Sequence, residues 1–103
     1  MIEDRANELF FSAASIWEIG IKNAMGKASF QFDPGVLRRA LLDGDYTELT
    51  MTSQHAIAAA ALPLLHSDPF DRMLIGQAAS EGFILVTNNH ATAKYSGPIK
   101  HVG

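Results

Sequence analysis

Cysteine is absent from this 103-residue sequence, and several other features are scarce enough to exclude whole classes of protein. Without thiols the chain can form neither a disulfide nor a thiolate metal site. The longest apolar run, Ala56 to Leu65, is too short to span a bilayer and contains a proline, so we expect no membrane contact. The opening MIEDRANELF lacks the basic and then apolar pattern of a secretory signal, which makes the cytoplasm the expected location.

Basic residues are also in the minority, with 8 lysines and arginines against 11 acids, a net charge of -3 and a pI near 5.7. A protein that holds nucleic acid mainly by neutralising phosphates is usually basic. Action on nucleic acid would therefore need local cations or a bound metal. The histidines show no HxxxH or HxH spacing, which disfavours zinc, and the sequence has no P-loop, G-x-S-x-G or G-x-G-x-x-G motif.

The sequence alternates short apolar runs with capped helical segments. Three apolar runs have the length of buried strands, at 8–13, 46–51 and 83–87. The run at 98–102 begins with Pro98 and is expected to form an edge strand. Residues 1–7 are typical of the end of a helix. Further helices are expected from Ser15, from Pro34, from Thr52 or Ser53, and from Asp68 to Glu81. This alternation predicts one α/β domain over residues 1–103 with a mainly parallel sheet.

The helix expected from Ser15 carries a clear apolar face. Trp17, Ile21 and Met25 recur at intervals of one turn, and Gly26 is a plausible end. We expect the lone Trp17 to lie in the core, whereas the apolar helices around 17–25 and 36–42 could also supply a surface for a partner or a second copy of the chain.

Oxygen-bearing side chains gather at one predicted edge of the sheet. Glu18 lies just beyond the strand at 8–13, and a helix between the strands opens with Asp68 and Asp71. Asn88 and Asn89 follow the strand at 83–87. Open α/β sheets bind ligands outside the carboxyl ends of their strands. Because Mg²⁺ and Mn²⁺ prefer oxygen ligands, these residues predict a metal site that can activate water and clamp a scissile phosphate.

Each of these residues also has a purely structural interpretation. Ser15 and Glu18 have the spacing of a capping box, and Asp68 before Pro69 is a favourable N-cap. Asp71 in the first turn interacts favourably with the helix dipole, and a cap or dipole contact contributes about 0.5 to 1 kcal/mol. The two asparagines are good caps as well. Capping explains each position singly, whereas the gathering of three regions at one edge favours a metal site.

These residues also lie in segments that resemble the PIN-domain ribonucleases, in particular the VapC-type toxins of bacterial toxin–antitoxin pairs. The matching segments are FFSAASIWEIGIKNAMGK, LPLLHSDPFDRMLIGQAASEGFILVT and NNHATAKY. The resemblance implies a three-layer α/β/α fold, Mg²⁺- or Mn²⁺-dependent hydrolysis of RNA, and inhibition by a cognate antitoxin. By position, it implies that Glu18 and Asp71 are metal ligands with Asp68 as an accessory. Thr87 and Asn89 fall on a motif that in this family usually reads Thr-x-Asp.

Two departures from the family pattern affect this implied site. The family begins with a central apolar strand that carries an aspartate, and the chain shows no such segment before residue 8. We therefore expect a PIN-like domain that is N-terminally truncated relative to the family and lacks its first, central strand. Asp4 lies in the wrong element to replace the missing acid. Asn89 stands where the family has another acid. A magnesium ion would therefore be held by one or two carboxylates together with water or substrate phosphate.

The resulting hypothesis is a metal-dependent endoribonuclease toxin of a VapBC-type pair, with little activity in this chain. Glu18, Asp71 and Asn89 are the expected catalytic residues, Thr87 and Asn88 support them, and water is the nucleophile. The alternative is a catalytically inactive module that binds an antitoxin or associates with itself, as a homodimer or by exchange of elements between copies. A third interpretation is a small α/β domain whose acids only cap helices.

Overall fold

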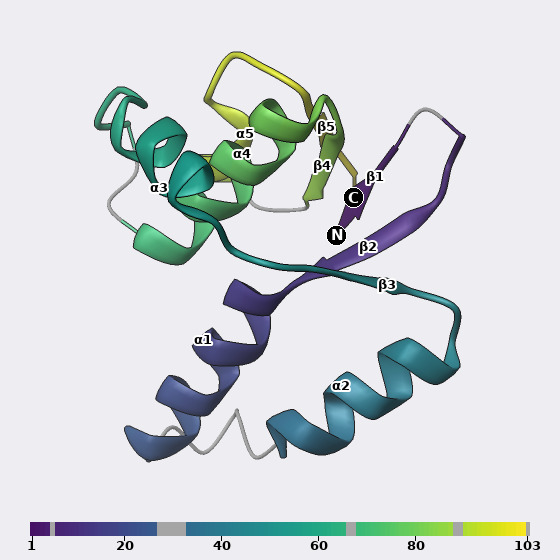
Figure 1. The fold of residues 1–103 in the computed structure, drawn as a ribbon. Helices are drawn as coiled ribbons and strands as arrows, with labels where there is room; N and C mark the ends of the chain where they lie inside the picture. The colour runs from purple at the N-terminus through teal and green to yellow at the C-terminus, as the bar shows by residue number, and fades with distance from the viewer. Residues whose placement is uncertain (5, 27–32, 66–67, 88–89, 103) are drawn as a thin grey trace.

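The computed structural model describes residues 1–4, 6–26, 33–65, 68–87 and 90–102. The strands in these ranges are β1 Ile2–Glu3, β2 Leu9–Ser12, β3 Thr47–Leu49, β4 Ile84–Thr87 and β5 Ile99–His101. They form one sheet in the order β3-β2-β1-β4-β5 (Figure 1). β2 pairs with β3 and β4 pairs with β5 in parallel, while β1 is antiparallel to both of its neighbours. The predicted α/β class is confirmed, with a mixed rather than a mainly parallel sheet.

The helices begin at or near the capping residues of the sequence. They are α1 Ala13–Ala24, α2 Pro34–Asp43, α3 Ser53–Ala60, α4 Pro69–Glu81 and α5 His90–Ala93. Asp33 caps α2 and Thr52 caps α3 by accepting backbone N–H groups, and Gly82 ends α4 with a φ of 70°. In Figure 1, α1 and α2 form one group and α3, α4 and α5 another, with β2 and β3 running between the groups. Among the described helices, none has the length and apolarity needed to cross a bilayer.

The centre of the sheet differs from the prediction. β1 is a strand rather than the end of a helix, and Ile2, which is 1% exposed, pairs with Phe10 of β2 and with Leu85 of β4. The chain then reverses because Asp4 Oδ1 accepts two backbone N–H groups of the following turn, in which Asn7 has a φ of 62°. A two-residue strand of opposite direction therefore occupies the central position that the sequence pattern predicted to lack a strand.

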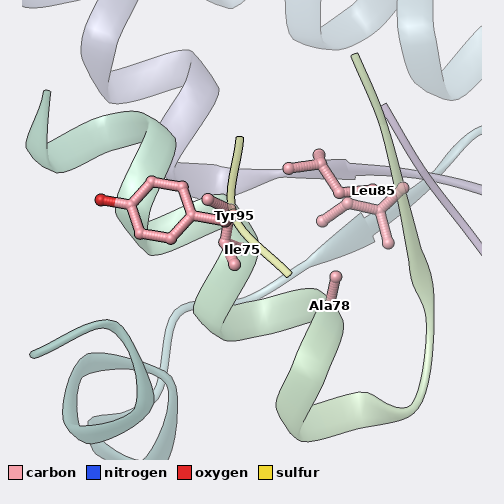
Figure 2. Packing of buried hydrophobic residues seen from close by; sticks show 5 residues of the cluster. Ile75, Ala78, Leu85 and Tyr95 are labelled. Atoms are coloured by element: carbon pink, nitrogen blue, oxygen red, sulfur yellow. The ribbon is translucent and has the colours of Figure 1, made fainter. Parts of the chain in front are cut away.

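The core lies between α4 and the middle of the sheet. Figure 2 shows Ile75 and Ala78 of α4 near Leu85 of β4 and Tyr95, and Ile2 belongs to the same buried cluster. The turn at Gly82 joins α4 to β4, and α4 packs back along that strand. The first turn of α4 consequently lies toward the carboxyl end of β4, which is the edge where the sequence predicts a site.

Candidate functional site

Glu18 lies in the second turn of α1, which follows β2 without an intervening loop. Ser12 caps this helix by accepting the backbone N–H of Ala14 at 3.0 Å, so the capping box predicted for Ser15 and Glu18 is wrong. The carboxylate of Glu18 instead lies 2.8 Å from Nζ of Lys22, one turn further along α1. Less than a third of either side chain is exposed, with 19% for Glu18 and 30% for Lys22. The ion pair therefore lies in a partly enclosed position.

Two further carboxylates come from the start of α4. Asp68 is its N-cap, as predicted, and accepts the backbone N–H of Phe70 at 2.9 Å, while Asp71 follows in the first turn. The pKa of Lys22 is raised above its ordinary value, chiefly by its hydrogen bond to Glu18. Partial burial opposes this rise in the pKa, and the negative charges of Glu18, Asp68 and Asp71 add to it. α1 and α4 thus bring three of the predicted site residues within electrostatic reach of one ammonium group.

Lys22 is a residue of this site that the sequence analysis did not single out. A signal was present, because a glutamate four residues before a lysine on a helix commonly forms an ion pair. Its ammonium now provides the positive charge beside Glu18 and reduces the repulsion among the three carboxylates.

A buried polar link joins α4 to the end of β2. Ser12 Oγ donates to Gln77 Oε1 at 2.5 Å, and Gln77 Nε2 donates to the carbonyl oxygen of Thr50 at 3.5 Å. Because Ser12 also caps α1, the link fixes the start of that helix, and hence Glu18, relative to α4. The sequence pattern does not predict the role of Gln77, because its partners lie 65 and 27 positions away in the chain.

Arg72 adjoins Asp71 in the sequence but binds a different set of partners. Its guanidinium donates, over distances of 3.0 to 3.2 Å, to the carbonyl oxygens of Ala59, Leu62 and Pro63 and to Tyr95 Oη. These carbonyl groups lie at or just beyond the end of α3, where helix acceptors lack intrahelical donors. Arg72 therefore anchors the first turn of α4 to the end of α3, and with it the position of Asp71.

The third predicted region is described only as far as Thr87. This last residue of β4 accepts the backbone N–H of Val102 through its carbonyl oxygen at 2.9 Å. Asn88 and Asn89 lie outside the described residues. The geometry of the candidate site therefore rests on α1 and α4.

The donor atoms suit a hard divalent cation, but their arrangement is incomplete. Glu18, Asp68 and Asp71 offer the carboxylate oxygens that Mg²⁺ and Mn²⁺ prefer. In the part of the chain that the structure describes, no three acidic or histidine side chains are arranged to hold a metal ion. A metal bound to Glu18 would also have to replace the ammonium of Lys22 there. The described residues alone do not form a finished metal centre.

An apolar hollow of about 150 Å³ is lined in part by residues that neighbour Glu18, Asp68 and Asp71 in the sequence. Its walls, which we call the aromatic hollow, are Ala14, Trp17, Met51, Pro69, Phe70 and Met73. The rings of Trp17 and Phe70 meet edge to face with their centroids 5.3 Å apart. Trp17 is 58% exposed, so the prediction that it lies in the core is wrong. Met25, the C-cap of α1, is 65% exposed as well. Helical spacing identified the apolar face but could not identify what covers it.

Comparison with known proteins identifies a family. The sequence model described as PIN domain matches residues 2–98, which is nearly the whole chain. No curated protein and no solved structure matches the chain. The matched range includes both helices that carry the gathered carboxylates.

Proposed function

Because the chain belongs to the PIN domain family, whose members are in general metal-dependent nucleases, we propose that it is a VapC-type endoribonuclease. In this proposal it acts on RNA in the cytoplasm, uses Mg²⁺ or Mn²⁺, and is the toxin of a VapBC-type pair restrained by a cognate antitoxin. The supporting observations are that Glu18 lies 2.8 Å from the ammonium of Lys22 and that the charges of Glu18, Asp68 and Asp71 all raise the pKa of that lysine.

The carboxylates have different roles in this proposal. Glu18 and Asp71 hold the metal, and Asp68 supports them while its Oδ1 caps α4. A bound divalent ion would stabilise negative charge at the scissile phosphate and activate the attacking water. The residues that position this water or the metal are those at and after the end of β4, namely Thr87, Asn88 and Asn89.

Lys22 opposes metal binding in the resting protein. Its ammonium lies 2.8 Å from Glu18, and it repels a second cation at the same carboxylate. Metal binding must therefore break this ion pair. We accordingly propose that the chain alone has low activity and needs a high metal concentration.

Cleavage of a labelled single-stranded RNA tests the proposed function. The rate is measured with Mg²⁺, with Mn²⁺ and with a chelator, for the wild-type protein and for Glu18→Gln and Asp71→Asn. We expect cleavage only with metal and at least a roughly tenfold slower rate in both variants, equivalent to about 1.4 kcal/mol in the barrier. Asp43→Asn, which neutralises an exposed acid at the end of α2, is the matched control and should cleave at the wild-type rate. Equal rates in Asp71→Asn and the wild type would contradict the proposal.

A second candidate is a module that binds an antitoxin or a second copy of the chain without catalysis. It is favoured by the neutralisation of Glu18 by Lys22 and by exposed apolar side chains, notably Met25 at the end of α1 and Val36 on α2. Light scattering over a range of concentrations tests for the homodimer, with Val36→Lys as the disrupting variant. A dimer broken by this substitution, together with no metal-dependent cleavage, would favour the second candidate over the nuclease.

A further inference from the structure

We propose that the aromatic hollow is a subsite for one unpaired base of the RNA, next to the candidate active site. This inference rests on the proposed function, because it assigns the hollow to the substrate of that site. Trp17 is the residue expected to stack on the base, with Phe70 as its supporting neighbour.

The hollow is built from the same helical turns as the carboxylates. Trp17 directly precedes Glu18 on α1, and Phe70 directly precedes Asp71 on α4. In the proposed arrangement, an RNA strand whose phosphate reaches the carboxylates and Lys22 places a neighbouring base against the two aromatic rings. Met51 and Met73 complete the walls with flexible side chains that adapt to a planar ring.

The volume and lining of the hollow indicate what it can accept. An apolar cavity of comparable volume in another protein holds a single benzene ring, so about 150 Å³ suits one ring system rather than a whole nucleotide. The lining side chains are all apolar, which favours stacking over hydrogen-bonded readout of the base. Proteins commonly recognise single-stranded RNA by stacking splayed-out bases on aromatic side chains, largely without regard to sequence.

The exposure of Trp17 is consistent with this role. Trp17 is more than half exposed to solvent, although its neighbour Phe70 is close enough for an edge-to-face contact. An apolar side chain of a partner protein could also fill such a hollow. We favour the base because Trp17 and Phe70 directly precede Glu18 and Asp71, which are proposed to cleave RNA. The fluorescence titration separates the two occupants.

Trp17 is the sole tryptophan of the chain, so intrinsic fluorescence reports directly on the hollow. The probe is a short single-stranded RNA of mixed sequence, and the same RNA annealed to its complement is the control. Titration in the presence of a chelator prevents metal-dependent cleavage during the measurement. We expect saturable quenching of Trp17 by the single strand and much weaker quenching by the duplex, whose bases are already stacked.

Substitution of Trp17 tests the energetic contribution of stacking. Stacking of one base on an aromatic side chain contributes about 1 to 3 kcal/mol, so Trp17→Ala should raise the Kd for labelled single-stranded RNA by about 5- to 150-fold. Trp17→Phe keeps an aromatic face and should recover most of the affinity. Ile57→Ala removes an exposed apolar side chain of α3 and should leave the Kd unchanged. Thermal unfolding of each variant checks that the fold is intact.

The outcomes distinguish the subsite from the proposed function. Metal-dependent cleavage without quenching, and with an unchanged Kd in Trp17→Ala, would overturn the subsite and leave the nuclease standing. Quenching and a raised Kd without cleavage would support the subsite and contradict the nuclease. No response to RNA, together with quenching by a purified antitoxin, would overturn the subsite and assign the hollow to a protein partner.

Discussion

Helix α4 meets its two helical neighbours in opposite ways. Along α3 the contact is close and its polar groups bind one another: buried His55 accepts the Thr52 N–H through Nδ1, and its Nε2 lies 2.8 Å from Glu81. Along α1 the contact leaves the aromatic hollow open and gathers carboxylates around Lys22. At the α3 contact the polar groups bind one another, and this stabilises the fold. The α1 contact leaves apolar surface and charge at its margin, where a ligand can bind.

Substitution of Gly76, where α4 contacts α3, is expected to have the largest effect on stability. A Cβ at this position would lie 2.8 Å from both the backbone nitrogen of Ala59 and the carbonyl oxygen of His55. Neither backbone atom can move without shifting α3. Gly76→Ala should therefore lower the free energy of unfolding by about 2 kcal/mol, as overpacking of a tight interface does. Urea denaturation followed by circular dichroism measures this change.

Gly20, in the middle of α1, is the matched control because a Cβ there would meet no atom of the described residues within 4 Å. Gly20→Ala should raise the stability by about 0.5 to 1 kcal/mol, the ordinary advantage of alanine over glycine inside a helix. Opposite signs for the two substitutions would confirm that the α3 contact is close and the α1 helix has free space. A neutral Gly76→Ala would show that the α3 contact is looser than the structure indicates.

Removal of Lys22 should produce the next largest effect on stability when Mg²⁺ is present. Lys22→Met leaves Glu18, Asp68 and Asp71 without their ammonium group, which increases their mutual repulsion and their affinity for a divalent cation. At a Mg²⁺ concentration ten times the Kd of the variant, its free energy of unfolding should rise by about 1.4 kcal/mol. Wild-type protein at the same concentration should gain less, since Lys22 competes with the metal. Thermal unfolding with and without Mg²⁺ measures both values.

The double variant Lys22→Met, Asp71→Asn separates this effect from a general influence of salt. It should lose most of the Mg²⁺ response, because one of the two principal carboxylates no longer carries charge. An equal response in the wild type and both variants would rule out metal binding at the carboxylates.

The elements that the sequence predicted well are those fixed by local chemistry. The starts of α2 and α4 follow from Asp33 and Asp68, which cap adjacent backbone groups, and the end of α4 follows from Gly82. β4 is a short apolar run bounded by turn residues, and Pro98 precedes the edge strand β5. In each case the determining interaction lies within a few residues along the chain.

The features that the sequence did not predict depend on distant partners. β1 has two residues, too few to show any periodicity, and it exists because Ile2 fits between strands that are far away in the sequence. The prediction that Trp17 lies in the core is wrong because helical spacing defines an apolar face but not which element packs against it. Arg72 binds carbonyl groups 9 to 13 positions away, which no helical pattern marks. For the candidate site, the sequence predicted Glu18, Asp68 and Asp71, but not Lys22, whose pKa their charges raise.

The ion pair between Glu18 and Lys22 should show the smallest effect, and its pH dependence has a definite sign. The folded protein raises the pKa of Lys22, chiefly through the hydrogen bond to Glu18, so the pair stabilises the fold fully below the ordinary lysine pKa of about 10.4. That contribution is lost as the pH rises through the higher pKa of the folded state. At pH 7 we expect Lys22→Met, without metal, to cost only about 0.3 kcal/mol, as for other partly exposed pairs four residues apart on a helix. Urea denaturation from pH 7 to 11.5 measures the difference from the wild type, which should shrink at the alkaline end, whereas Lys100→Met on β5 gives the background change. A difference that grows with pH would contradict the direction of the pKa shift and the view that Lys22 serves as the cation of the carboxylate cluster.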